Sequence, residues 1–409
     1  MTSEYFPSRW IADFQYWWAA GAAWLEGWSP YAADHIAWAQ EWFPTFTDPF
    51  FYPPSAVPLL APIAALDPHI GAQLLAILGL VSIIGSSVLL ACASGDDRHA
   101  WWRFSFLVLF LGVLFHPTTV ILTFSGLHLI LLSGLSLWIY GVRRGVRSVE
   151  VLGLVLLCVK PIYGGPLLLW CCLQPERRGA ASSAAGICVG LFLLGTGGRP
   201  ILAEAEAWMA NAAQYGTLAI NDPTASAGLG FLAGLLDLRL GLVPLALLLL
   251  ATVLAAWSLR VIDPVLVAVR LMLSTLFLWN GHGTDFVFAL PALVLVLERG
   301  ALAPRLLLAV ALLALGQAMQ IAALVDPMAQ FRQSASNAAV ATVALTMAML
   351  AYGAVVRASA RTEGQTPMPY ADALLSAFQF RMPAQLASIR RRGWAGPGRQ
   401  RRPQGSSAP

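Results

Sequence analysis

The sequence is poor in charge, and it contains a single lysine. Only 11% of the residues are charged, whereas 58% are hydrophobic and the mean hydropathy is +0.69. A soluble globular domain has about 25% charged residues, so this composition excludes that class and predicts a polytopic membrane protein. The one lysine, Lys160, stands in an apolar run directly before Pro161. An ionisable group in such a place calls for an explanation.

Several other features are missing. The five cysteines lie in apolar runs without metal-ligand spacing, which predicts small buried side chains and not disulfides or ligands. The sequence shows no Gly-rich phosphate loop and no convincing internal repeat, and nothing in it indicates nucleotide or nucleic-acid binding. The N-terminus lacks the basic and short apolar regions of a cleavable signal. We therefore expect no cofactor, no metal and no nucleic-acid partner.

Three regions follow from the distribution of apolar runs. Residues 1–68 are rich in tryptophan, residues 69–356 hold the apolar runs, and residues 357–409 form a basic tail. The middle region predicts an all-α, multispanning membrane domain of about 11 helices, some of them short or broken. The tail is expected to be largely disordered. Its segment 373–394 fits either a helix on anionic lipid or an unstructured basic stretch.

The individual helices are predicted from apolar runs and from proline and glycine positions. Their expected ranges are 69–93, 104–115, 118–140, 149–160, 162–174, 180–196, 240–258, 264–279, 285–297, 305–325 and 336–356. Several are too short to span a bilayer alone. The pairs that meet at His116-Pro117 and at Lys160-Pro161 are interpreted as helices broken where a protein-walled cavity begins.

Arginine decides the predicted topology, because arginine-rich loops stay in the cytoplasm. These loops are 141–148, 174–180, 259–263, 298–305 and the C-terminal tail. One alternating path through the cell inner (plasma) membrane satisfies all five. It leaves residues 1–68, the turns at His116, Lys160 and 280–284, and the loops 197–225 and 326–335 on the extracytoplasmic side. Either the first helix exports the N-terminal segment or, as we favour, a membrane helix belongs upstream of it.

The N-terminal segment combines aromatic residues with one acid. Five tryptophans between residues 10 and 28 are typical of a helix in the membrane interface. Asp13 has no such explanation, and it shares a helical face with Tyr16. Its carboxylate fits a general base or a helix N-cap. Tyr52 lies in a proline-rich entry to a short helix, and its hydroxyl is expected at the lip of the cavity.

Ionisable groups also occur at the predicted breaks and in a late polar turn. For Lys160, a functional role is favoured over snorkelling to the interface. For His116, a functional role and a hydrogen bond to a freed helix carbonyl are both open. His282 and Asp285 lie in the turn 280–285, where Asp285 also suits a helix N-terminus.

The loop 197–225 predicts an amphipathic helix that packs over the mouth of the cavity. Glu204 and Glu206 lie two positions apart, which puts them on different faces of that helix and argues against a shared metal. Both acids are expected on a solvated face.

Taken in order, four motifs resemble glycosyltransferase family 87 over roughly residues 10 to 300. They are Ala-Asp-Phe-x-x-Tyr with a following Gly-x-x-Pro-Tyr (Asp13, Tyr16, Gly27, Pro30, Tyr31), Tyr-Pro-Pro with a later proline (Tyr52, Pro53, Pro54, Pro62), Lys-Pro (Lys160, Pro161) and His-x-x-Asp (His282, Asp285). The resemblance implies a type C membrane enzyme. Such an enzyme takes a hexose, often mannose, from a polyprenyl-phosphate sugar donor and adds it to a lipid or glycan acceptor outside the cytoplasm, within membrane lipid.

By this resemblance, Asp13 is the general base that deprotonates the acceptor, in a single displacement that inverts the anomeric carbon. Lys160 neutralises the leaving phosphate, and His282 contacts that phosphate or orients the acceptor. The other expected substrate-binding residues are Tyr16, Tyr31, Tyr52, His116 and Asp285. The chain departs from the family at residues 125–128, which read Ser-Gly-Leu-His where relatives often show a Gly-Asn or Gly-Gln turn.

Two other functions fit part of the pattern. A transporter or flippase for a lipid-linked sugar also needs a cavity with lysine and histidine, but it needs no outward carboxylate on an interfacial helix, and it should show repeated halves. An inactive relative that serves as a scaffold is the third alternative.

Overall fold

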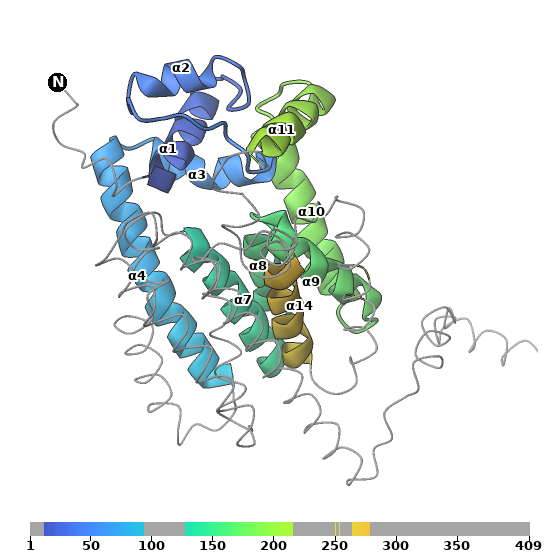
Figure 1. The fold of residues 1–409 in the computed structure, drawn as a ribbon. Helices are drawn as coiled ribbons and strands as arrows, with labels where there is room; N and C mark the ends of the chain where they lie inside the picture. Colours follow the sequence, from blue (N-terminus) through green and yellow to red (C-terminus); the bar gives the residue numbers. More distant parts are fainter. Residues whose placement is uncertain (1–11, 94–126, 216–249, 251–252, 254–263, 279–409) are drawn as a thin grey trace, which may run out of the picture. The chain divides into compact units, whose positions relative to one another are not determined.

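The computed structural model describes residues 12–93, 127–215, 250, 253 and 264–278. All of them belong to one compact unit, Met1–Pro367. The described elements are helical, and no strand occurs among them, as predicted for an all-α protein. In chain order they are α1 (Ala12–Leu25), α2 (His35–Gln40), the 3-10 helix η1 (Pro54–Ala56), α3 (Val57–Ala64), α4 (Pro68–Ala93), α7 (Leu127–Arg144), α8 (Arg147–Leu157), α9 (Pro161–Leu173), α10 (Arg178–Gly195), α11 (Ile201–Tyr215) and α14 (Pro264–Leu278) (Figure 1).

Two of the described helices are long and apolar enough to cross a membrane. They are α4, with 26 residues, and α10, with 18 residues. At 1.5 Å per residue, α4 is about 39 Å long and exceeds the hydrocarbon core of about 30 Å. Helices α8 and α9 have 11 and 13 residues, so each is too short to span alone.

Most helix positions in the described residues agree with the sequence prediction. The ranges predicted as 69–93, 149–160, 162–174, 180–196 and 264–279 correspond to α4, α8, α9, α10 and α14, with ends that differ by a few residues. The helix predicted at 118–140 is described from residue 127 and continues to Arg144 as α7. The helices predicted at 104–115, 285–297, 305–325 and 336–356 lie outside the described residues, as does all of 240–258 except residues 250 and 253.

The predicted break at Lys160 is confirmed. Helix α8 ends at Leu157, and α9 begins at Pro161 with Lys160 as its N-cap, at φ −116° and ψ 90°. Proline disfavours helical backbone at the residue before it, whereas its own fixed φ suits the first position of a helix. The Lys-Pro pair therefore ends one helix and starts the next.

Side-chain contacts bring several arginine-bearing turns to one end of the helices, which we call the arginine end. The Arg144 guanidinium donates to the Cys92 carbonyl at 2.6 and 3.1 Å, which joins the last turns of α7 and α4. Arg177 forms an ion pair with Glu150 at 3.1 Å, which joins the α9–α10 turn to the start of α8. Helix α8 starts at the arginine end and α9 finishes there. Lys160, between the finish of α8 and the start of α9, therefore lies at the opposite end, which we call the lysine end.

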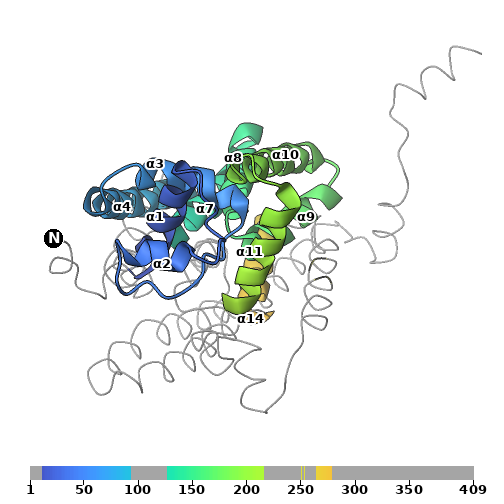
Figure 2. The same ribbon diagram turned by 90° about the horizontal axis from the view of Figure 1, so that it is seen from above.

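The N-terminal segment packs at the lysine end. Figure 1 shows α1, α2, α3 and α11 gathered at one end of α4 and α10, and Figure 2 views them from that side. Gly21 of α1 lies so close to α3 that a Cβ there would be 2.6 Å from the Ala64 Cβ. The Trp18 indole donates to the Leu66 carbonyl at 2.9 Å. These contacts fix α1 against α3 and the start of α4.

Two of the five N-terminal tryptophans are core residues. Trp17 and Trp18 are 4% and 5% exposed, and Trp18 packs with Phe14, Phe43 and other apolar side chains. The prediction that the tryptophans lie in the membrane interface is therefore wrong for these two. Trp28 is 49% exposed and so is not part of the protein core.

The predicted amphipathic helix is α11, and it holds the N-terminal segment in place. Trp208 donates to the Phe51 carbonyl at 3.0 Å, and Asn211 donates to the Phe50 carbonyl at 3.2 Å. At the start of the helix, Glu204 accepts hydrogen bonds from Arg199 at 2.8 Å and from Ser29 at 3.0 Å.

The prediction of a solvated face is right for Glu206, which is exposed, and wrong for Glu204, which is 5% exposed. The partners of Glu204 explain the difference. A carboxylate that is hydrogen-bonded to a guanidinium and a hydroxyl can be buried without an unpaired charge.

Replacing Glu204 with alanine should destabilise the protein, because Arg199 and Ser29 lose a buried partner. We expect the free energy of unfolding to fall by about 2 kcal/mol, below the range for fully buried pairs because Arg199 is partly exposed. Thermal unfolding of the detergent-solubilised protein measures the change as a lower Tm. Glu206→Ala, on the same helix, is the matched control and should leave the Tm nearly unchanged. Equal Tm values for the two variants would contradict the role given to Glu204.

Candidate functional site

Lys160 is the cation at the break between α8 and α9. It is half-buried, and its Nζ lies 3.2 Å from Nε2 of His128 on α7. The ammonium also lies over the ring of Tyr163, 5.1 Å from its centroid, a cation–π contact. The N-terminus of α9 adds the positive end of a helix dipole at the same place. The break therefore presents a concentration of positive charge.

His128 is a partner that the sequence analysis did not assign. Its segment was noted only as a departure from the family pattern, whereas the structure places it in α7 with an exposure of 6% and in contact with Lys160. One feature of the sequence could have identified His128 as a site residue. An ionisable side chain within an apolar helix of a membrane protein is a functional candidate by default.

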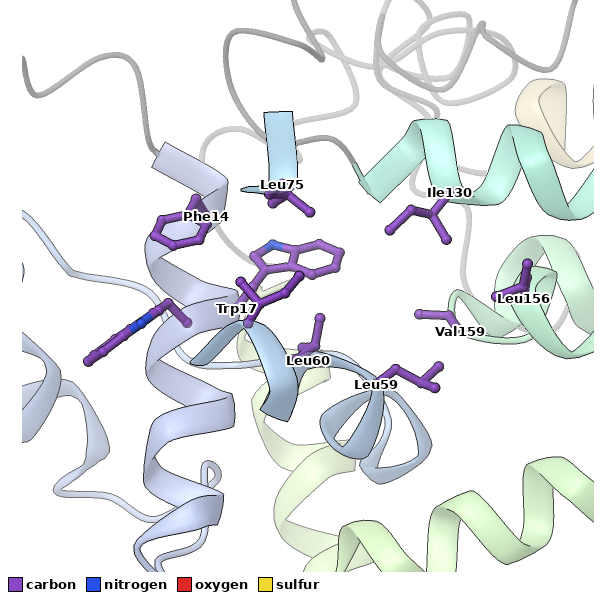
Figure 3. A pocket seen from close by; sticks show the side chains of 10 residues that line it. Phe14, Trp17, Leu59, Leu60, Leu75, Ile130, Leu156 and Val159 are labelled. Carbon is purple, nitrogen blue, oxygen red and sulfur yellow. The ribbon is translucent and has the colours of Figure 1, made fainter. Parts of the chain in front are cut away.

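An apolar pocket of about 200 Å³ is lined in part by residues that are close in sequence to this pair. Its lining comes from α1 (Phe14, Trp17, Trp18), α3 (Leu59, Leu60, Ile63), α4 (Leu75), α7 (Ile130) and the α8 end of the break (Leu156, Val159). Figure 3 shows Phe14 and Trp17 on one side of the pocket and Ile130, Leu156 and Val159 on the other. Val159 directly precedes Lys160, and Ile130 follows His128 by two residues. The pocket lining thus reaches the residue before Lys160, whereas Lys160 and His128 themselves are not among the lining residues.

Asp13 and Tyr16 both lie in α1, three residues apart and hence on one face. The structure describes the backbone of Asp13 and not its side chain. Because Ala12 before it is already helical, Asp13 is not an N-cap. The Tyr16 hydroxyl donates to Asp48 at 3.0 Å. Burial, with a smaller contribution from the Asp48 charge, raises the pKa of Tyr16 to about 12, so the phenol stays protonated at neutral pH.

The structure brings Tyr31 and Tyr52 together. The Tyr31 hydroxyl, which is buried, donates to the Tyr52 carbonyl at 2.7 Å, and burial raises the pKa of Tyr31 well above its ordinary value. The Tyr52 ring is also buried and packs on Trp17, with centroids 4.8 Å apart. Both tyrosines therefore support a tryptophan that lines the pocket.

The remaining predicted site residues, His116, His282 and Asp285, lie outside the described residues. Among the residues that the structure does describe, no group of three or more histidine, cysteine or acidic side chains could hold a metal ion.

The described residues thus form a helical protein with two apolar helices of membrane-spanning length, an apolar pocket and a lysine at a helix break. Residues 50–280, more than half of the chain, match the family model of Glycosyltransferase family 87. The chain belongs to this family and is a membrane glycosyltransferase, as the motifs predict. No curated protein and no solved structure matches it.

The matched region covers part of the predicted site. It includes Tyr52, His116 and Lys160, as well as His128. It starts after α1, so Asp13, Tyr16 and Tyr31 precede it, and it ends before His282 and Asp285.

The geometry of the break depends on Gly164, one turn into α9. A Cβ at this position would lie 2.5 Å from the Cys158 nitrogen and 2.6 Å from its Cα, whereas a Cβ at Gly165 would meet nothing within 4 Å. Backbone atoms cannot move aside as a flexible side chain does. Only glycine at position 164 allows α9 to lie so close to the end of α8.

Gly164→Ala should therefore displace Lys160 and destabilise the protein by about 1–3 kcal/mol, the usual cost of overpacking. Gly165→Ala is the matched control, and its higher helix propensity should leave the Tm unchanged or slightly raised. Thermal unfolding and sugar transfer are measured on both variants. Equal behaviour of the two would show that the close contact at Gly164 is not required.

Proposed function

We propose that the protein transfers a mannosyl group from a polyprenyl-phosphate donor to a lipid or glycan acceptor on the extracytoplasmic face of the cell inner membrane, as a type C glycosyltransferase. The observation that carries this proposal is the Lys160–His128 pair at a helix break where the preceding residue, Val159, lines an apolar pocket. A polyprenyl-phosphate sugar joins an anionic phosphate to a long apolar chain. The cation complements the phosphate, and the apolar pocket complements the polyprenyl chain.

The charge at the break suits a phosphate. An ammonium within an apolar helical domain is costly unless it faces a polar partner or ligand. The N-terminus of α9 adds the positive end of a helix dipole, although Pro161 has no N–H and the Tyr163 and Gly164 N–H groups donate to the Lys160 carbonyl at 2.9 and 3.3 Å. We infer that the donor phosphate lies at this N-terminus, in contact with Lys160.

In the proposed reaction, the acceptor hydroxyl oxygen attacks the anomeric carbon while the bond from that carbon to the phosphate oxygen breaks. Asp13 takes the hydroxyl proton as general base. The phosphate keeps the bonding electron pair and stays on the polyprenyl carrier, and Lys160 stabilises its added charge. Attack opposite the leaving group inverts the anomeric configuration.

The position of Asp13 supports its role. Asp13 precedes Phe14 on α1, and Phe14 and Trp17 line the same pocket as Val159, the residue before Lys160. One helix thus carries the proposed base and part of the pocket wall. We propose that Tyr16, Tyr31 and Tyr52 shape this side of the substrate site.

We propose that His116, His282 and Asp285 complete the site from segments outside the described residues. The extracytoplasmic orientation is supported by the separation of charges along the helices. Arg144, Arg147 and Arg177 belong to turns at the arginine end, and positive loops stay in the cytoplasm. We propose that the basic tail is cytoplasmic as well.

Replacing Lys160 with methionine should raise the donor KM about 10- to 100-fold or abolish transfer, because one charge-assisted hydrogen bond to the phosphate is lost. Transfer from labelled polyprenyl-phosphate mannose is measured in detergent or proteoliposomes, together with the Tm. Arg143→Met removes a cation at the arginine end and serves as the control. An unchanged donor KM would make Lys160 a snorkelling anchor.

Asp13→Asn should lower kcat about 10²- to 10⁴-fold, since the amide cannot accept the acceptor proton. Donor KM should change little, because Asp13 acts on the other substrate. The matched control is Asp34→Asn, an exposed aspartate of the same N-terminal segment. Unaltered transfer by Asp13→Asn would remove Asp13 from the reaction.

A further inference from the structure

We propose that His128 is a positioning residue, which holds the Lys160 ammonium where the donor phosphate binds. The imidazole then affects sugar transfer through the lysine and not by touching the substrate. This inference rests on the proposed function, in which Lys160 contacts the phosphate.

The hydrogen bond joins two separate elements. His128 belongs to α7, and Lys160 belongs to the break between α8 and α9, with 3.2 Å between Nε2 and Nζ. Helix α7 is closely packed on α8, since a Cβ on Gly153 would lie 2.6 Å from the Trp138 nitrogen and 2.6 Å from the Gly134 carbonyl oxygen. The imidazole therefore belongs to a helix that cannot shift freely relative to the break.

The donor and the acceptor of this hydrogen bond follow from the charge of the lysine. A charged lysine can only donate, so Nε2 of His128 accepts and the imidazole carries its proton on Nδ1. The pair then holds one positive charge, located on the lysine. An ammonium has three N–H donors, so a hydrogen bond to His128 is compatible with a second one to a phosphate oxygen.

The hydrogen bond to His128 preorganises the Lys160 side chain for binding of the donor. A lysine side chain has four flexible carbon–carbon links, and fixing it when the donor binds would cost conformational entropy. The contacts with His128 and with the Tyr163 ring restrain the ammonium beforehand. A restraint made before binding lowers the cost of binding itself.

A double-mutant cycle tests this role. His128→Phe removes the acceptor but keeps a ring, whereas His128→Gln keeps an acceptor oxygen. We expect His128→Phe to raise the donor KM for polyprenyl-phosphate mannose about 3- to 10-fold with a smaller effect on kcat, and His128→Gln to restore most of the loss. In the Lys160→Met background, His128→Phe should change the donor KM less than about twofold, because the lysine through which it acts is gone.

The Tm of every variant is recorded, and where Lys160→Met turns over too slowly, the donor Kd from equilibrium binding replaces KM. If His128→Phe fails to fold, His128→Met supplies a flexible side chain without the acceptor. The same fold-change in both backgrounds would overturn the positioning role, as would a normal KM for His128→Phe beside a raised KM for Lys160→Met. A wild-type protein that transfers no sugar from this donor, or a normal KM for Lys160→Met, overturns the proposed function and the positioning role together.

Discussion

The site depends on one covalent constraint, the proline that follows Lys160. Pro161 has no N–H to continue α8, and its ring forces Lys160 into extended backbone. The chain therefore stops one helix and starts another inside the apolar domain. Gly164 then permits α9 to return within contact of Cys158. As a result, the only lysine in the sequence stands at a helix N-terminus, beside a histidine and directly after Val159, which lines an apolar pocket.

A second set of contacts attaches α11 to the N-terminal segment. Glu204 joins Arg199 to Ser29, and α11 binds the carbonyls of Phe50 and Phe51. Residues separated by more than 150 positions are thereby tied together. Because Tyr52 packs on Trp17, this attachment also supports the α1 wall of the pocket. The α11 contacts and the α1 wall of the pocket are thus linked through residues 50–52.

Local sequence patterns were sufficient to place the helices that are bounded by a proline or by a charged turn. Pro68, Pro161 and Pro264 each begin a helix near the predicted position, since proline acts on its own neighbours. The same patterns could not predict that Glu204 is buried, because one of its partners is 175 residues away. They could not pair His128 with Lys160 either, across 32 residues. Burial and partnership are set by tertiary packing, which periodicity does not encode.

The family match begins at residue 50, yet the segment before it is part of the same structure. Gly21 and Trp18 of α1 contact residues 60–66, which lie within the matched region. The pocket has walls from both segments. In the proposed reaction, this division places the base on α1 and the phosphate-binding cation on the α8–α9 break. A displacement needs its base and its leaving group on opposite sides of the reacting carbon, so walls contributed by two independent elements suit the chemistry better than a site built on one helix.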